Sequence, residues 1–387
     1  MQRFTLSTII LLGSLATRFF IPAAHAQSAG STLTPAAGFA PLFLGAAVPA
    51  TANNGPGFPA GIWELSHEND WFIYSDRDYT GGLRLAYTTP NYSTWSQVPL
   101  SPTGLGSLFD QINGISDADS VVAAAVYAQL NIYTPNDTEK VVPSPTDHPY
   151  SGWLGVGMDL IRQSAERRAI FEVNAGLVGP DTGAEDLQNS FHSEIGDNQS
   201  VGWNTQLKDE PVLQLTYRQD WRPAALTDLS DASPGSFNYD VIGHGLVTVG
   251  NGWDYAATGV VARWGYHLPM DFGPARMRLG DVDTEPYQPS SSGKGQAMDW
   301  SLNALSAYAC FGAEGRAVAR DITLDGNTWA NSPSVVHKPL VAEIYTGLIV
   351  EYGHFRGSFL ALYESTTFYS QPQPGQWRGI LTLGVAY

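Results

Sequence analysis

The sequence has little of three features that often define a protein's class. Its single cysteine, Cys310, cannot form an internal disulfide, which excludes a cross-linked scaffold. Beyond the N-terminal region, no segment offers the roughly 20 consecutive apolar residues of a membrane-spanning helix. Basic residues are few: 20 Lys and Arg face 37 Asp and Glu, and the resulting net charge of −17 argues against a nucleic-acid partner. A soluble secreted β protein and a β-barrel, whose strands need only about ten alternating residues, both remain compatible.

The first 26 residues have the layout of a secretory signal peptide. Arg3 precedes an apolar run at 9–15, and Ala-His-Ala at 24–26 supplies a small-x-small cleavage site. Residues 27–60 consist mainly of Ala, Gly, Pro, Thr and Ser and are predicted to be a flexible leader without a core of its own. We therefore expect an exported protein whose folded part spans 61–387.

From residue 61 onward, apolar and polar residues alternate in short segments bounded by Gly, Pro, Asn and Asp, which is the pattern of β-strands. Thirteen segments show it: 61–69, 80–89, 121–132, 151–163, 168–178, 210–220, 242–249, 255–266, 301–311, 315–323, 341–352, 356–365 and 376–387. Single-chain bacterial barrels have an even number of strands, so we join 301–311 to 315–323 through a glycine-marked bend at 312–315. The prediction is an all-β fold, a transmembrane antiparallel β-barrel of about 12 strands. The aromatic content and the terminal Tyr387 are typical of outer-membrane barrels.

The strand parity also predicts the topology. If both ends of the barrel chain are periplasmic, the outer loops are 70–79, 133–150, 179–209, 250–254, 324–340 and 366–375. The inner connections at 90–120 and 267–300 are then unusually long. In the third outer loop, residues 184–192 lack proline and interior glycine and are predicted to form a short helix capped by Asp181 and Thr182. Gln188 and His192 stand four residues apart and share one face of that helix.

Four polar clusters fall on this predicted outer rim. They are Glu68-Asn69-Asp70, Asp78-Tyr79-Thr80, Lys140, and Gln188 with His192. Each cluster alone is more often turn chemistry or a solvated surface group than a site. Together they would gather oxygen ligands, a hydroxyl, a cation and an imidazole, a set able to perform hydrolysis.

The sequence resembles the lipid A 3'-O-deacylase (LpxR) family of outer-membrane barrels over roughly 61–387. The blocks that carry the resemblance, in one order along the chain, are 67–70, 76–85, 129–135, 147–153, 176–183, 188–192 and 202–207. The resemblance implies a twelve-stranded barrel with a calcium-dependent active site near the outer leaflet, between the barrel wall and a loop helix. It also implies lipid A, or lipopolysaccharide, as the partner in the outer membrane, and we expect a monomer.

Residue by residue, the family's site maps onto this chain. Its Asn-Asp pair falls on Asn69 and Asp70, which are the expected calcium ligands, and its strand-two threonine falls on Thr80. Its loop lysine falls on Lys140, and its loop-helix glutamine and histidine fall on Gln188 and His192.

One position departs from the family pattern. Where the compared member has a glutamate six residues after the catalytic histidine, this chain has Asn198, with Asp197 and Glu194 nearby. The partner of the His192 imidazole is therefore left open among these three residues.

The resemblance implies water attack on an ester, with His192 as general base and then general acid, calcium taking up the oxyanion charge, and Lys140 neutralising phosphate. Three alternatives remain. An outer-membrane phospholipase would need a serine nucleophile, but Ser190 and Ser193 point away from His192 on a helix. A pore or structural barrel would need a wet lumen. A soluble secreted β enzyme is disfavoured because the strand pattern persists to Tyr387.

Overall fold

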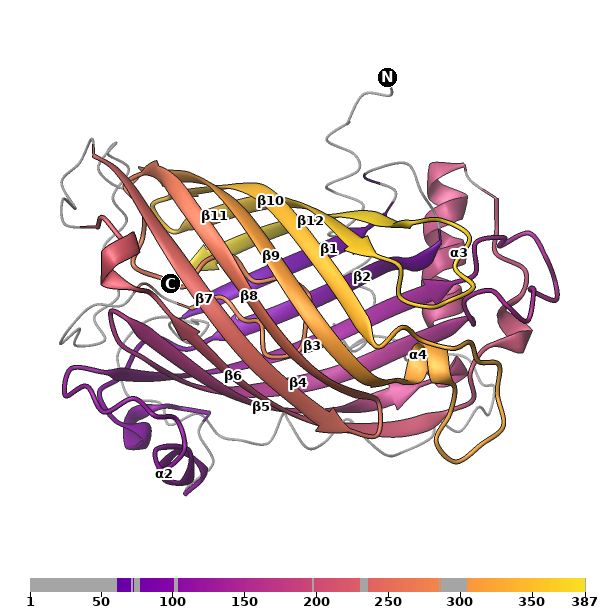
Figure 1. The fold of residues 1–387 in the computed structure, drawn as a ribbon, viewed down its shortest axis with the longest axis horizontal. Helices are drawn as coiled ribbons and strands as arrows, with labels where there is room; N and C mark the ends of the chain where they lie inside the picture. Colours follow the sequence, from indigo (N-terminus) through magenta and orange to yellow (C-terminus); the bar gives the residue numbers. More distant parts are fainter. Residues whose placement is uncertain are drawn as a thin grey trace, which may run out of the picture. The chain divides into compact units, whose positions relative to one another are not determined.

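Twelve antiparallel strands close into a barrel in the computed structural model, which describes residues 61–70, 72, 77–100, 104–196, 198–229, 236–284, 286 and 305–386 (Figure 1). Each strand pairs with its neighbours in the chain, and β1 closes the barrel by pairing with β12. The strands are β1 (Ile62–Asn69), β2 (Asp78–Thr88), β3 (Val121–Thr134), β4 (Ser151–Gln163), β5 (Arg167–Val178), β6 (Glu210–Trp221), β7 (Phe237–Gly250), β8 (Trp253–Tyr266), β9 (Leu305–Asp321), β10 (Leu340–Tyr352), β11 (Phe355–Ser365) and β12 (Gly375–Ala386). The predicted barrel of about 12 strands is confirmed, whereas the signal peptide at 1–26 and the leader at 27–60 lie outside the described residues.

Joining 301–311 to 315–323 was correct, because β9 is one strand of 17 residues. The bend predicted at 312–315 is wrong, since β9 pairs with β10 through these residues without a register shift. Gly312 serves packing instead: a Cβ atom there would lie 2.1 Å from the ring of Tyr345. The irregularity in this part of the wall is a register shift between Asp254 and Tyr255 of β8, which leaves Ala319 of β9 as the extra residue.

The described part of the chain has three short α-helices outside the strands. Helix α3 (Ala184–Ile195) and helix α4 (Ile322–Asp325) lie at one end of the barrel, and α2 (Leu105–Phe109) lies at the other (Figure 1). The end with α3 and α4 carries the β1–β2, β3–β4 and β5–β6 connections and is the predicted outer rim. None of the helices in the described part of the chain is long and apolar enough to cross a membrane.

The long connection between β2 and β3 folds back against the outside of the wall at the opposite rim. Phe109 of α2 and Ile115 pack with Leu160 of β4 and Ala169 of β5. The hydroxyl of Tyr217 on β6 donates to the carbonyl oxygen of Ile112 at 2.9 Å. This connection therefore covers the ends of several strands at the rim opposite α3.

The connection after β8 enters the lumen. Arg276 forms ion pairs with Asp281 (2.9 Å), Glu314 of β9 (2.7 Å) and Glu343 of β10 (2.8 Å). Further along, the backbone nitrogen of Gly280 donates to Glu172 of β5 at 2.9 Å. Residues 267–284 thus bridge opposite sides of the barrel and fill its interior with paired charges.

A cavity of about 120 Å³ lies in the lumen, on the outer-rim side of this segment. Its lining includes Tyr79, Gln129, Asn131, Arg278, Gln376 and Arg378. Because side chains alternate along a strand, the lumen-facing Gln129 and Asn131 identify Leu130 and Ile132 of β3 as facing outward.

Candidate active site on the outer face of the barrel wall

Helix α3 packs on the outside of the barrel wall. Ala184, with Leu187 beside it, joins a buried apolar cluster that contains the outward-facing Leu130 and Ile132 of β3. On β4, a Cβ atom at Gly152 would lie 2.5 Å from Cβ of Ala184, so this glycine permits the close approach. The site is therefore built between a helix and the lipid-side surface of the barrel.

The start of α3 differs from the prediction. Its N-cap residue is Gly183, which has a positive φ of 72° and makes no side-chain cap hydrogen bond. Asp181 and Thr182 instead belong to a preceding 3-10 turn (Pro180–Thr182), and the Thr182 hydroxyl accepts from the Ala184 amide at 3.4 Å. The prediction that Asp181 and Thr182 cap the helix is wrong because the extra turn moves the cap to a glycine that can adopt the left-handed conformation.

Gln188 and His192 share the buried face of α3, as their spacing predicts. Their side chains are 3% and 4% exposed, whereas Ser190 and Ser193 are exposed on other faces of the helix. The ring of Phe191, next to His192, lies 6.2 Å from the ring of His67 on β1. The C-terminal part of α3 therefore lies beside β1.

The imidazole of His192 is oriented by a main-chain carbonyl. Its Nδ1 lies 2.6 Å from the backbone oxygen of Asn198. A carbonyl oxygen only accepts, so Nδ1 donates in this contact and, in the neutral ring, Nε2 is the basic nitrogen. The side-chain amide of Asn198 instead donates to Glu139 at 2.5 Å, and Glu194 is exposed. Asp197 lies outside the described residues.

The segment that follows α3 holds the helix in place. Asn189 and Ser200 exchange two hydrogen bonds, of 3.3 and 2.9 Å. The indole nitrogen of Trp203 donates to Oε1 of Gln188 at 3.2 Å. Residues 198–203 thus contact three side chains of one helical stretch: Gln188, Asn189 and His192.

Asn69 and Thr80 lie on neighbouring strands of the wall. Asn69 is opposite Gly81 in the β1–β2 ladder, and a Cβ atom at Gly81 would lie 2.9 Å from the Asn69 side-chain nitrogen. A bulge in the β2–β3 ladder leaves Thr80 as the extra residue between Tyr79 and Gly81. Tyr79 consequently lines the lumen, while the Thr80 hydroxyl lies 2.5 Å from that of Thr134 on β3.

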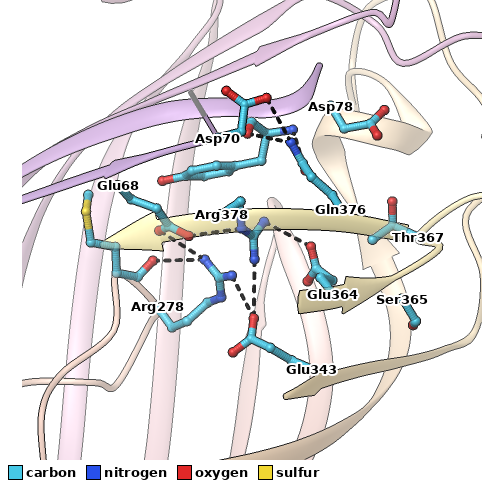
Figure 2. A network of polar contacts seen from close by, with 12 residues as sticks. Glu68, Asp70, Asp78, Arg278, Glu343, Glu364, Ser365, Thr367, Gln376 and Arg378 are labelled. Atoms are coloured by element: carbon cyan, nitrogen blue, oxygen red, sulfur yellow. Dashed lines mark hydrogen bonds and ion pairs between the residues drawn. The ribbon is translucent and has the colours of Figure 1, made fainter. Parts of the chain in front are cut away.

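Asp70 is held from the β12 side of the hairpin (Figure 2). Its Oδ2 accepts from the Arg77 backbone nitrogen at 2.9 Å and from Nε2 of Gln376 at 3.3 Å. The same Gln376 amide accepts from the Tyr79 nitrogen at 3.2 Å and donates to the Tyr79 oxygen at 3.0 Å. Gln376 therefore clamps both ends of the β1–β2 connection.

Lys140 lies on the adjacent β3–β4 loop but faces solvent. Its side chain is 59% exposed, and Nζ lies 2.8 Å from Asp137, whose hydrogen bond and charge raise the pKa of the ammonium group. The neighbouring Glu139 contacts Asn198, so the loop itself abuts the segment that orients His192. The ammonium group is outside the buried part of the site.

Two groups of predicted residues are thus assembled in different ways. Hydrogen bonds with 198–203 tie Gln188 and His192 together, and strand pairing places Asn69 beside Thr80. The His67–Phe191 contact joins the groups, because His67 is two residues from Asn69 and Phe191 precedes His192. The joint catalytic role of these residues remains a prediction.

Two side chains of the site were not singled out from the sequence. Trp203 lies in the block at 202–207, which is used above only for the family resemblance. Its indole N–H, a donor that needs an acceptor when buried, is the feature of the sequence that could have indicated a role in the site. Gln376 lies in β12, some 300 residues from the hairpin it clamps, and no local pattern indicates that contact.

Comparison with known proteins agrees with this architecture. The family model described as "Outer membrane protein LpxR" matches residues 39–387. Among solved structures, LpxR from Salmonella typhimurium superposes with a TM-score of 0.63 at 17% identity, covering 84% of this chain and all of that one. The β domain of the Bordetella autotransporter BrkA gives a TM-score of 0.39 at 8% identity, covering 85% of this chain and 99% of its own. No curated protein sequence matches. The extent of the family match shows that this chain belongs to the LpxR family of outer membrane proteins.

Proposed function

We propose that this protein is a calcium-dependent hydrolase that removes the 3'-linked acyl chain from lipid A in the outer membrane. The observation that carries the proposal is the placement of His192. It lies on the buried face of α3, against the outer face of the barrel wall, and its Nδ1 donates to a backbone carbonyl. Family membership supports the substrate class. An ester of a membrane lipid could reach this position laterally.

The protein residues supply the proton transfers. Nε2 of His192 would take a proton from water as the water oxygen attacks the ester carbonyl carbon. When the tetrahedral intermediate collapses, the bond to the sugar oxygen breaks and the imidazolium returns the proton to that oxygen. The products are a free fatty acid and a sugar hydroxyl. The Asn198 carbonyl keeps the ring oriented throughout because it remains bonded to Nδ1.

Asn69 and Asp70 would hold calcium. A carboxylate and an amide oxygen are ligands of the kind that calcium takes, and it requires six to eight oxygens in total. No group of three or more His, Cys, Asp or Glu side chains within the described residues could hold a metal ion, so carbonyls, water and lipid oxygens would complete the set. When bound, the ion would supply positive charge for the oxyanion.

The alternatives receive less support. Ser190 and Ser193 are exposed while His192 is buried, which disfavours a serine–histidine phospholipase. The lumen contains residues 267–284 and their ion pairs, which disfavours a pore.

Mass spectrometry of lipid A tests the proposal. Lipid A from cells that express the protein, supplied with calcium, should lose the mass of one 3'-linked acyl unit, and cells with His192→Gln should retain it. Ser190→Ala, on the exposed face of the same helix, is the matched control and should behave as wild type. Full calcium-dependent release by His192→Gln would show that His192 is not the base. No release by the wild type would refute the function.

A further inference from the structure

The side-chain amide of Gln188 has a buried donor without a partner in the described part of the chain. Its Nε2 has no hydrogen-bond partner among the described residues, although the residue is only 3% exposed. An unmade hydrogen bond of this kind is costly, and a native site that retains one commonly has a use for it. The question is what this N–H group is oriented to bind.

Trp203 determines which end of the Gln188 amide is left unpaired. An indole nitrogen only donates, so the group that it contacts at 3.2 Å must be the carbonyl Oε1. The amide nitrogen therefore occupies the other branch. In the absence of the indole contact, the two ends could exchange by rotation about the terminal torsion.

Trp203 is itself rigidly held. It is 1% exposed, its ring lies 4.8 Å from that of Tyr150, and it packs in the cluster with Leu130 and Ile132. The preceding Gly202 allows this packing, because a Cβ atom there would lie 2.6 Å from the Tyr150 ring. A fixed indole next to the helix is a suitable anchor for one amide orientation.

Gln188 stands one helical turn before His192 on the same buried face of α3. Its amide nitrogen and the imidazole consequently share the space between the helix and the wall. We propose that Nε2 of Gln188 donates to the ester carbonyl oxygen as it becomes an oxyanion, and that Trp203 is the positioning residue that directs it there. This inference rests on the proposed function and adds to it the donor and the residue that orients the donor.

Kinetics on purified protein in mixed micelles of lipid A and detergent test the pair. Gln188→Glu keeps an acceptor for Trp203 but removes the donor, and kcat should fall about 10²- to 10³-fold, the usual effect of losing one oxyanion donor. Trp203→Phe keeps an aromatic ring but removes the indole N–H, and kcat should fall about tenfold with KM unchanged to within about twofold. Adding Trp203→Phe to Gln188→Glu should cost nothing further.

Tyr150→Phe is the matched control, because it keeps the ring that packs against Trp203 and removes the hydroxyl that donates to the Thr138 oxygen. It should leave kcat unchanged, and the thermal unfolding of all variants should be compared. Losses that multiply in the double variant, or an equal loss in Tyr150→Phe, would assign Trp203 a packing role and overturn the inference.

A phosphonate analogue of the ester provides a readout that does not require turnover. Its affinity should fall about tenfold in Trp203→Phe and remain unchanged in Tyr150→Phe. If the wild type cleaves lipid A but Trp203→Phe retains full kcat and analogue affinity, the inference fails and the function stands. If the wild type neither cleaves lipid A nor binds the analogue, both fail.

Discussion

Arg276 offers a direct test of how the luminal segment is held. Its guanidinium makes charged hydrogen bonds to three carboxylates, at 2.9 Å to Asp281, 2.7 Å to Glu314 and 2.8 Å to Glu343. Arg276→Met retains much of the side-chain volume and removes all three bonds. We expect the barrel to fold but with a lower free energy of unfolding.

The expected loss in unfolding free energy depends on which ion-pair partners each carboxylate retains. A hydrogen bond to a charged group contributes about 1.5–3 kcal/mol, so three independent bonds would set an upper limit near 9 kcal/mol. The carboxylates do not become isolated, however: Glu314 retains His244 at 2.9 Å and Glu343 retains Arg278 at 2.9 Å. The expected loss is therefore about 3–5 kcal/mol, as for breaking one buried ion pair.

Urea unfolding in lipid vesicles, followed by tryptophan fluorescence, measures this quantity. Arg167→Met is the matched control, because Arg167 is exposed at the rim opposite α3 and its guanidinium makes a long hydrogen bond, of 3.4 Å, to the Gly114 carbonyl. It should change stability by less than about 0.5 kcal/mol. A loss below about 1 kcal/mol for Arg276→Met would refute the view that these ion pairs anchor residues 267–284.

Two further predictions concern the site. Lys140→Ala should raise KM for phosphorylated lipid A a few-fold and leave kcat unchanged. The rise in KM should become smaller as the NaCl concentration of the assay increases, because salt screens an exposed cation. A lower kcat that does not depend on the NaCl concentration would contradict this. Gln376→Leu removes the hydrogen bonds to Asp70 and Tyr79, and the dissociation constant for calcium, measured by calorimetry, should rise about tenfold. An unchanged calcium affinity would show that Gln376 does not position Asp70.

The wall of the barrel could be predicted from the sequence because its period-two pattern is local. β4 was predicted with the bounds it has, whereas β7 begins at Phe237 rather than at 242. Asn238 and Asp240 resemble turn residues, but both are buried, and Asp240 pairs with Arg222 and Arg263. In a barrel with a charged lumen, inward positions of a strand carry the residue types that elsewhere indicate a loop.

The interior of the barrel could not be predicted in the same way. Residues 267–300 were identified only as an unusually long inner connection. Arg276, Arg278 and Asp281 show no helical or strand period, and charges in such a stretch usually indicate solvation. Their partners, such as Glu343, are far away in the sequence and are brought to them by barrel closure.

For the site, the sequence identified side chains but could not identify main-chain contacts. The sequence makes the side-chain amide of Asn198 a candidate partner of His192, yet it is the backbone carbonyl of Asn198 that accepts the hydrogen bond from the imidazole. Every residue has such a carbonyl, so only the path of the chain after α3 determines which one reaches the imidazole. The same holds for Trp203, whose donor is apparent in the sequence but whose acceptor is not.

The filled lumen and the position of α3 are linked by the physical chemistry of the lipid substrate. Moving an acyl chain from hydrocarbon into a polar lumen costs about 0.8 kcal/mol per methylene, or about 8 kcal/mol for ten methylenes. Under the proposed function, a site between α3 and the outward-facing Leu130 and Ile132 would avoid that cost, because the acyl chain would remain beside an apolar wall while its ester approached His192. The lumen is then free to be packed with ion pairs such as those of Arg276, which stiffen the wall that supports the site. An enzyme acting on a membrane ester thus gains from placing its histidine outside the barrel, where the bilayer itself delivers the substrate.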